Sequence, residues 1–270
     1  MSVRMLASCV IVFACVAVPL HAAELITNGD FEGPATNMGV STTIPAGRDS
    51  LPDTIPNGWT RWESFWGGGP ELAQIIPVVN NGPSLPGATA MDFSRAQGGA
   101  SGDYTVIHQA TAIDASKYNS LALSIDANVV IHNLVAGGTV TPAFEWPVMV
   151  QIDYTALDNS SQIWRYGWYI AQPGDGSRVN DPGGGLIATY NDMLVQPNTW
   201  VANSFNLFNE LPQVKTIDRV LVGGTGWDYH GLADNVSLQG EYIPEPASAV
   251  LVFFGLGAVA SRLRRRLRIG

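Results

Sequence analysis

The stretch Leu121-Ala-Leu-Ser-Ile-Asp-Ala-Asn-Val-Val-Ile131 decides the fold class of this chain. Apolar and polar side chains alternate along it with a period of two, which is the pattern of a β-strand with one buried face. The set expected to face a core comprises Leu121, Leu123, Ile125, Ala127, Val129 and Ile131, and the opposite set comprises Ser124, Asp126 and Asn128. The pattern therefore predicts a half-buried strand.

Similar patterns recur on both sides of this stretch. Strands are predicted at residues 72–79, 89–93, 103–110, 148–154, 163–170, 186–190, 200–208, 217–222 and 232–238. Pro77 places the first of these at a sheet edge. A short helix is expected at residues 210–215, and residues 33–70, rich in Gly, Pro, Thr and Asn, are expected to be mostly loop. Many strands without a long helix predict a single all-β domain over residues 24–242, a β-sandwich or a barrel.

Two terminal segments are expected to lie outside this domain. Residues 1–23 have the apolar run and the small residues of a secretory signal peptide, with cleavage after Ala22 or Ala23. Residues 247–261 form a second apolar run, which as a helix would span roughly 22 Å, short of the ~30 Å hydrocarbon core. The arginines that follow it favour the cytoplasmic side of a membrane, which places the domain outside. They are Arg262, Arg264, Arg265 and Arg266. Composition alone fits a plain C-terminal membrane anchor.

Pro244, Glu245 and Pro246, just before the second run, give this segment a more specific resemblance. The order Pro-Glu-Pro, short apolar helix, arginine cluster resembles the PEP-CTERM sorting signal of exported bacterial proteins, here within residues 243–270. The resemblance implies a partner, a membrane protease of the exosortase type that cuts near Pro-Glu-Pro. It also implies transient anchoring by a C-terminal transmembrane helix, followed by a cell-surface or extracellular location.

Cysteine and charge content exclude several kinds of site and partner. Cys9 and Cys15 both lie in the signal peptide, so the mature chain has no disulfide, thiolate or cysteine metal site. All 23 acidic residues lie between Glu24 and Glu245, and six of the 14 basic residues lie in the terminal segments, so residues 24–245 carry a net charge of −15. This charge argues against nucleic acid or anionic lipid as a partner of the domain.

Four short motifs give the domain a resemblance as well. They are Asn28-Gly29-Asp30-Phe31-Glu32, Asn57-Gly58-Trp59, Asn198-Thr199-Trp200 and Ala233-Asp234-Asn235-Val236-Ser237-Leu238. Their order is similar to that in the galactose-binding-like jelly rolls, which include many carbohydrate-binding modules. The resemblance implies a jelly-roll sandwich with a structural Ca²⁺ where the first and last strands meet. Carried over, the ligands would be Glu32 and Asp234, with Asp30 as a further candidate. The long segment 33–70 and the glycine-rich segment 172–185 depart from the family pattern.

Asp234 has two interpretations from the residues themselves. If Leu232, Val236 and Leu238 face the core, Asp234 points the same way, and a buried carboxylate must be paired, hydrogen-bonded or bound to a metal. Asp234 is therefore either a calcium ligand or a cap for backbone N–H groups at a strand end.

The tryptophans are the candidate ligand-binding residues, because sugar sites combine flat aromatic faces with a few fixed polar groups. Trp62, Trp66 and Trp227 lie in glycine-rich stretches and are expected to be exposed. Trp164 and Trp168 share one face of residues 163–170, where they either pave a binding face or belong to the core.

Trp59 and Trp200 are expected in the core, and suitable polar neighbours for a sugar site are Arg61, Arg165 and Asp228.

Signals of catalysis are weak. His108, His132 and His230 are isolated, without the spacing of a zinc site, and no Gly-x-Ser-x-Gly nucleophile motif occurs. The sequence therefore predicts an exported, surface-sorted, non-catalytic protein that binds carbohydrate or extracellular polysaccharide. The alternatives are a structural protein of an extracellular matrix or biofilm, and a glycan-active hydrolase on the same scaffold.

Overall fold

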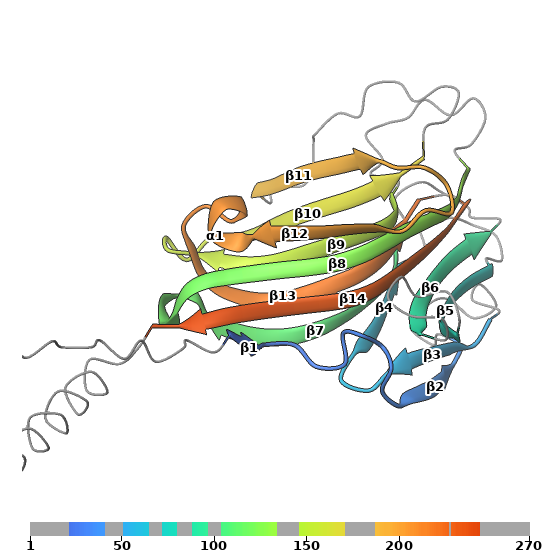
Figure 1. The fold of residues 1–270 in the computed structure, drawn as a ribbon, viewed down its shortest axis with the longest axis horizontal. Coiled ribbons are helices and arrows are strands. Elements are labelled where there is room, and N and C mark those ends of the chain that lie inside the picture. Colours follow the sequence, from blue (N-terminus) through green and yellow to red (C-terminus); the bar gives the residue numbers. More distant parts are fainter. Residues whose placement is uncertain are drawn as a thin grey trace, which may run out of the picture.

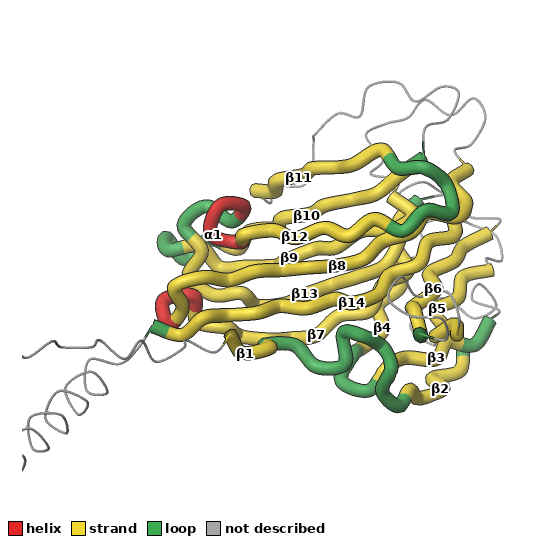
Figure 2. The backbone as a smooth tube through the Cα atoms, viewed as in Figure 1, coloured by secondary structure: helices red, strands yellow, loops and turns green. Residues whose placement is uncertain are grey.

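The computed structural model describes residues 22–40, 51–64, 72–79, 88–96, 104–133, 146–170, 187–226 and 228–243. Most of these residues are in strands, with one 3₁₀ turn, η1 (Ala115–Lys117), and one four-residue helix, α1 (Leu207–Glu210) (Figure 2). The all-β prediction is confirmed. Of the two terminal segments predicted to be a signal peptide and a sorting signal, only Ala22, Ala23 and Ile243 belong to the described residues. No helix in the described part of the chain is long and apolar enough to cross a membrane.

Two sheets make up the body of the molecule (Figure 1). The first, which we call the β14 sheet, has the order β12 (Val201–Asn206), β8 (Tyr118–Asn133), β14 (Asp228–Tyr242), β6 (Thr89–Ala96), β5 (Leu72–Val79), with β1 (Ala22–Glu24) also paired to β14. The second, the β13 sheet, has the order β11 (Ile187–Leu194), β10 (Ser161–Tyr169), β9 (Trp146–Ala156), β13 (Val214–Thr225), β7 (Tyr104–Asp114), β4 (Thr60–Ser64). A separate pair is formed by β2 (Ala35–Gly39) and β3 (Asp53–Pro56).

Successive strands alternate between the two sheets. The chain passes from β6 to β7, β8 and β9, and later from β12 to β13 and β14, changing sheet each time. As a result, the order β6-β14-β8-β12 lies opposite the order β7-β13-β9-β10, which is the strand arrangement of a jelly roll. The predicted jelly-roll sandwich is confirmed. Pro77 lies on β5 at the edge of its sheet, as predicted, since proline has no N–H for an outer neighbour.

The core lies between the sheets and is built from alternate positions of their strands. From β8 it receives Leu121, Leu123, Ile125, Ala127 and Val129, each at most 1% exposed. The same buried cluster includes Val148, Val150 and Ile152 from β9. The period-two pattern therefore identified the buried face of both strands correctly.

Two local predictions are wrong. Ile131 is 43% exposed, because β8 advances by two residues between its pairings with Gly231 and His230 where β14 advances by one, and the extra residue turns Ile131 to the other face. The short helix occurs at Leu207–Glu210, where the Asn206 side chain caps it by accepting from the Phe208 N–H, and β13 already begins at Val214. Within the segment 33–70 the structure describes residues 33–40 and 51–64, and it places the strands β2, β3 and β4 there.

Candidate functional site

A bulge in β14 decides where Asp234 points. Asp234 pairs with Asp126 and Ser237 pairs with Ser124. Between these two pairs β14 advances by three residues and β8 by two, so β14 contains one extra residue. The inserted residue is Asn235, which has a φ of 50°. After the bulge, Val236 faces the core, whereas Asp234 shares the outer face of the sheet with Asp126. The prediction that Asp234 points the same way as Val236 and Leu238 is wrong for this reason.

Asp234 is nevertheless buried, at 2% exposed. Its Oδ1 accepts a hydrogen bond from the Asn235 N–H at 2.7 Å, and the Asn235 Nδ2 donates to Asp126 Oδ2 at 2.8 Å. Burial raises the pKa of Asp234 to about 7. The Asn235 N–H opposes this rise, whereas the carboxylates of Asp126, Glu32 and Asp30 add to it. The hydrogen bond from the Asn235 N–H to Asp234 is a backbone cap, as one of the two interpretations of Asp234 predicts. The cap lies at a bulge within β14 and not at a strand end.

The N-terminal segment crosses β14 at this bulge, as the family resemblance implies for the first and last motifs. The Val236 N–H donates to the Gly29 carbonyl at 2.8 Å. A Cβ on residue 29 would lie 1.8 Å from the Val236 carbonyl oxygen, so only glycine allows this approach.

The proposed calcium ligands share this neighbourhood without forming a coordination sphere. Both carboxylate oxygens of Glu32 accept hydrogen bonds from Thr89, one from its N–H and one from its hydroxyl, and Asp30 Oδ1 accepts from the Glu32 N–H. Across the described ranges, no three His, Cys, Asp or Glu side chains are grouped so that they could hold a metal ion. The residues as placed do not fit a ready-made Ca²⁺ site.

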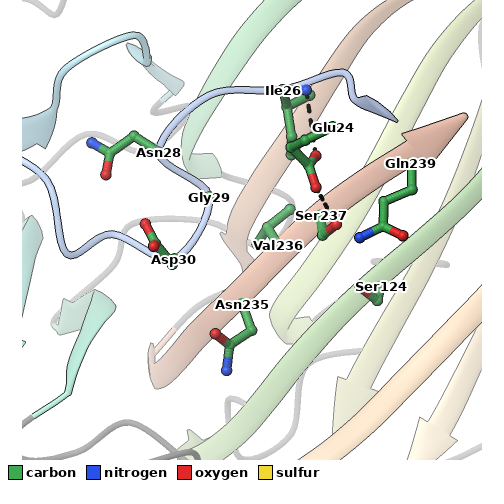
Figure 3. A pocket seen from close by; sticks show the side chains of 10 residues that line it. All are labelled: Glu24, Ile26, Asn28, Gly29, Asp30, Ser124, Asn235, Val236, Ser237 and Gln239. Carbon is green, nitrogen blue, oxygen red and sulfur yellow. Dashed lines mark hydrogen bonds between the residues drawn. The ribbon is translucent and has the colours of Figure 1, made fainter. Parts of the chain in front are cut away.

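A polar groove with a cavity volume of about 340 Å³ flanks the bulge (Figure 3). The Glu24 carboxylate bridges one side of it, accepting from the Ser237 hydroxyl and, at 2.8 Å, from the Leu238 N–H. The other polar lining residues are Asn28, Asp30, Ser124, Asn235 and Gln239. Among the described residues, no aromatic side chain lines the groove, so this part of the chain offers it no flat apolar surface on which a sugar ring would pack.

The outer face of the β13 sheet carries a different arrangement, which we call the Trp62 face. Trp62 on β4 is 38% exposed, and its ring lies 5.9 Å from that of Tyr104 on β7 at an interplanar angle of 6°. The Arg219 guanidinium lies 5.5 Å from the centre of the Trp62 ring. The Arg165 guanidinium lies 5.2 Å from the Tyr104 ring and donates to the Tyr104 hydroxyl at 2.9 Å. Each of the two parallel aromatic rings thus has a guanidinium group close to it.

A chain of hydrogen bonds crosses the same face from β10 to β13. Arg165 Nε donates to Gln151 Oε1, and Gln151 Nε2 donates to Asp153 Oδ1. Asp153 Oδ2 in turn accepts from Arg219 Nε at 2.8 Å. Because each side chain stands on a paired strand and is held by its neighbours, the polar groups are fixed before any ligand arrives.

His108 on β7 also belongs to the Trp62 face. Burial lowers the pKa of His108, the positive charge of Arg219 lowers it further, and Asp153 opposes the change. The imidazole is therefore neutral at pH 7, with one nitrogen able to accept and the other to donate. Next to it, a small apolar cluster of Val106, Trp146, Met149 and Leu221 is buried on this outer side of the sheet.

Trp164 and Trp168 do not pave a binding face. Both side chains are fully buried and point into the core from β10, since their positions alternate with that of Arg165 on the outer face. Their indole N–H groups donate to Glu210 Oε2 at 3.3 Å and Asn203 Oδ1 at 3.0 Å. Of their two predicted roles, the structure supports the core and contradicts ligand binding.

The outcomes differ for the other predicted tryptophans and for Arg61. Trp59 is buried, as predicted, and Trp200 is only half-buried. Trp66 and Trp227, the other two candidates for exposure, lie outside the described residues. Arg61 does not serve the Trp62 face, because it is bound to Asp53 Oδ2 at 2.5 Å and to the Gly39 carbonyl at 2.8 Å.

Sequence reasoning missed most of the Trp62 face. The sequence predicts Trp62 and Arg165 as candidates, but not Tyr104, His108, Gln151, Asp153 or Arg219. The alternation of apolar and polar residues shows that a side chain points outward, but not which outward residues meet.

Comparisons with known proteins add a set of distant structural likenesses. No protein-family model and no curated protein matches the chain. Among solved structures, a family 11 carbohydrate-binding module of a cellulosomal cellulase of Clostridium thermocellum is 9% identical, with 79% of this chain and 98% of that chain covered and a TM-score of 0.36. A family 61 carbohydrate-binding module in complex with β-1,4-galactotriose is 9% identical, with coverage of 81% and 99% and a TM-score of 0.38. A cyclase from Fischerella sp. TAU is 14% identical, with coverage of 83% and 100% and a TM-score of 0.39. The jelly-roll assignment rests on the strand order of this chain itself.

Proposed function

We propose that this protein is an exported, non-catalytic module that is held at the cell surface and binds carbohydrate at the Trp62 face. The observation that carries the proposal is the half-exposed Trp62 ring beside a fixed row of hydrogen-bonding side chains. The apolar side of a sugar ring packs on an exposed indole, and hydroxyl groups pair with fixed donors and acceptors. Arg219 and His108 supply such groups next to Trp62.

Trp62→Ala is expected to weaken binding to the recognised polysaccharide by about 10- to 100-fold, as for an aromatic residue at the centre of a binding site. The measurement is affinity gel electrophoresis across a panel of polysaccharides with the wild-type protein and the variant. Phe208→Ala is the matched control, because Phe208 is 36% exposed and lies on α1, away from the face. Folded wild-type protein that is retarded by no polysaccharide would overturn the proposal.

A structural role without a specific ligand is the second candidate, and the burial of Trp59, Trp146, Trp164 and Trp168 favours it. If that role is correct, the fluorescence of Trp62 does not change with any glycan. Catalysis is not favoured, because Asp153 on the Trp62 face is already bound by Arg219 and Gln151. A general acid or base needs a free oxygen directed at the substrate.

The export half of the proposal rests on the sequence. The N-terminal signal directs secretion, the apolar run 247–261 anchors the chain transiently, and an exosortase-type protease cuts near Pro244–Pro246. In a host with such a protease, replacing Pro244, Glu245 and Pro246 by alanine is expected to keep most of the protein in the membrane fraction as the uncut form. Unchanged release of the triple variant would contradict this processing.

A further inference from the structure

The two ends of the described chain leave the jelly roll side by side. On β1, Ala22 pairs with Glu241 and Ala23 pairs with Gly240 of β14. The Ile243 N–H, just beyond β14, donates to the Lys117 carbonyl at 2.9 Å. Figure 1 shows β1 beside the arrowhead end of β14, at the same end of the molecule as α1. We call this the terminal end.

The terminal end gathers exposed apolar side chains from separate parts of the chain. Leu157, in the turn after β9, is 63% exposed, and Phe208 on α1 is 36% exposed. Tyr242 and Ile243 are 47% and 46% exposed. The Leu157 N–H donates to the Gln213 carbonyl, which places its turn beside the start of β13 and hence next to α1. Exposed apolar side chains occur elsewhere on the domain too, for example Ile131 and Leu194, so what distinguishes this set is that it lies next to the predicted membrane anchor.

The chain that follows the domain limits how far this end can lie from a membrane. Ile243 is four residues from the apolar run that begins at Ala247. An extended chain spans at most about 3.5 Å per residue, so this connection reaches about 14 Å. That length keeps the terminal end close to the headgroup layer of a bilayer.

Charge indicates which kind of lipid surface the terminal end fits. Both lysines of the chain, Lys117 and Lys215, lie here. The carboxylates at this end are Asp114, Asp158, Glu210, Asp218 and Glu241. The acids outnumber the lysines, so attraction to anionic lipid does not drive the contact. The acidic groups do not oppose the insertion of apolar side chains into the headgroup region of a neutral bilayer.

We propose that the terminal end is a membrane-contact surface, with Leu157, Phe208 and Ile243 at the headgroup layer of a neutral bilayer while the apolar run 247–261 is embedded. This inference rests on the membrane attachment included in the proposed function. The strands then rise away from the membrane. Trp62 pairs with Val106, eight residues along β7 from Asp114 at the terminal end, which is roughly 26 Å at strand rise. The Trp62 face is thereby held above the headgroups and opens sideways to a glycan.

The test places a fluorophore at single cysteines in the full chain. Cys9 and Cys15 are first replaced by serine, which leaves no other cysteine. Leu157→Cys and Phe208→Cys then carry an environment-sensitive dye at the terminal end. Ile131→Cys is the matched control, since Ile131 is 43% exposed and pairs with His230 at the opposite end of β14. The labelled chains are reconstituted into phosphatidylcholine vesicles that contain a quencher attached to the lipid headgroup.

The expected result is quenching at positions 157 and 208 that exceeds quenching at position 131 several-fold. Equal quenching at all three positions, or none at 157 and 208, would overturn the orientation. A chain that fails to float with the vesicles would overturn the inference together with membrane attachment. Carbohydrate binding by the same vesicles is measured separately, so its loss would count against the proposed ligand and not against the orientation.

Discussion

Trp168→Ala is expected to lower the free energy of unfolding by about 3–5 kcal/mol, the cost of removing a large aromatic side chain from a packed core. Trp168 is fully buried, and its ring lies 5.1 Å from that of Tyr166. Its removal leaves a cavity between the sheets and deprives Asn203 Oδ1 of its 3.0 Å hydrogen bond. The loss is therefore one of stability and not of ligand contact.

Urea unfolding, followed by far-ultraviolet circular dichroism, measures this change. Trp168→Phe is expected to cost less than Trp168→Ala, because it keeps an aromatic ring and loses only the indole N–H and some volume. Trp62→Ala is the paired comparison and is expected to change stability by about 1 kcal/mol or less, since substitutions of exposed side chains have small effects. If both alanine variants were equally stable but only Trp168→Ala lost carbohydrate binding, the assignment of the Trp62 face would be wrong.

The second large effect concerns the pH dependence that Asp234 imposes on folding. The pKa of Asp234 is raised from 3.8 to about 7 in the folded state, so folding retains a proton that the unfolded chain releases. The stability from this group is fully present below about pH 4 and is lost as the pH rises through 7. Between these limits the change is about 4 kcal/mol, because the pKa rises from 3.8 to about 7 and each pKa unit corresponds to roughly 1.4 kcal/mol.

Asp234→Asn isolates this contribution, because the amide keeps an oxygen for the Asn235 N–H and carries no charge. With EDTA present, the variant is expected to exceed the wild type in unfolding free energy at pH 8 and to match it near pH 4. The difference between the two proteins removes the contributions of the other carboxylates. A constant difference across the pH range would show that Asp234 titrates normally.

The effect of added Ca²⁺ on the stability of the wild type and of an Asp234 variant tests the predicted calcium site. A structural Ca²⁺ at Asp234 stays a prediction from the family resemblance, and a bound cation would favour the ionised carboxylate. In that case millimolar Ca²⁺ raises the melting temperature of the wild type at pH 8, EDTA reverses the rise, and Asp234→Ala is insensitive to both. Melting temperatures that do not respond to calcium would leave the backbone-capping role alone.

The positions of side chains on the two faces of the β13 sheet explain why Trp168→Ala is expected to change stability and Trp62→Ala is expected to change binding. On β10, Trp168 and Arg165 lie three residues apart and therefore on opposite faces of the sheet, one in the core and one beside Tyr104. Substitutions on one face are expected to change stability, and substitutions on the other are expected to change binding. The same parity governs β9, where Ile152 is in the core and Gln151 on the Trp62 face.

Local alternation determined much of the fold. It located β8, β9 and β10, and it identified the buried face of β8 from Leu121 to Val129, because a half-buried strand must repeat its apolar side chains every second residue. For β10 it left open whether Trp164 and Trp168 face the core. It also placed Pro77 at an edge, because the backbone chemistry of proline is local. Strand partners are not local, so the order of the sheets and the parallel pairing of β10 with β11 followed only from the tertiary structure.

A single inserted residue shows where local patterns stop being informative. Asn235 shifts the register of β14, which turns Asp234 outward while Val236 faces inward, and an extra residue in β8 exposes Ile131 in the same way. The Trp62 face has a similar origin, since Trp62 and Arg219 are distant in sequence and meet only because β4 and β13 both pair with β7. The sequence by itself determined which side chains are apolar, which alternate and where the charges lie. Only the tertiary structure decided which of them meet, because register and strand order depend on the packing of the whole sandwich.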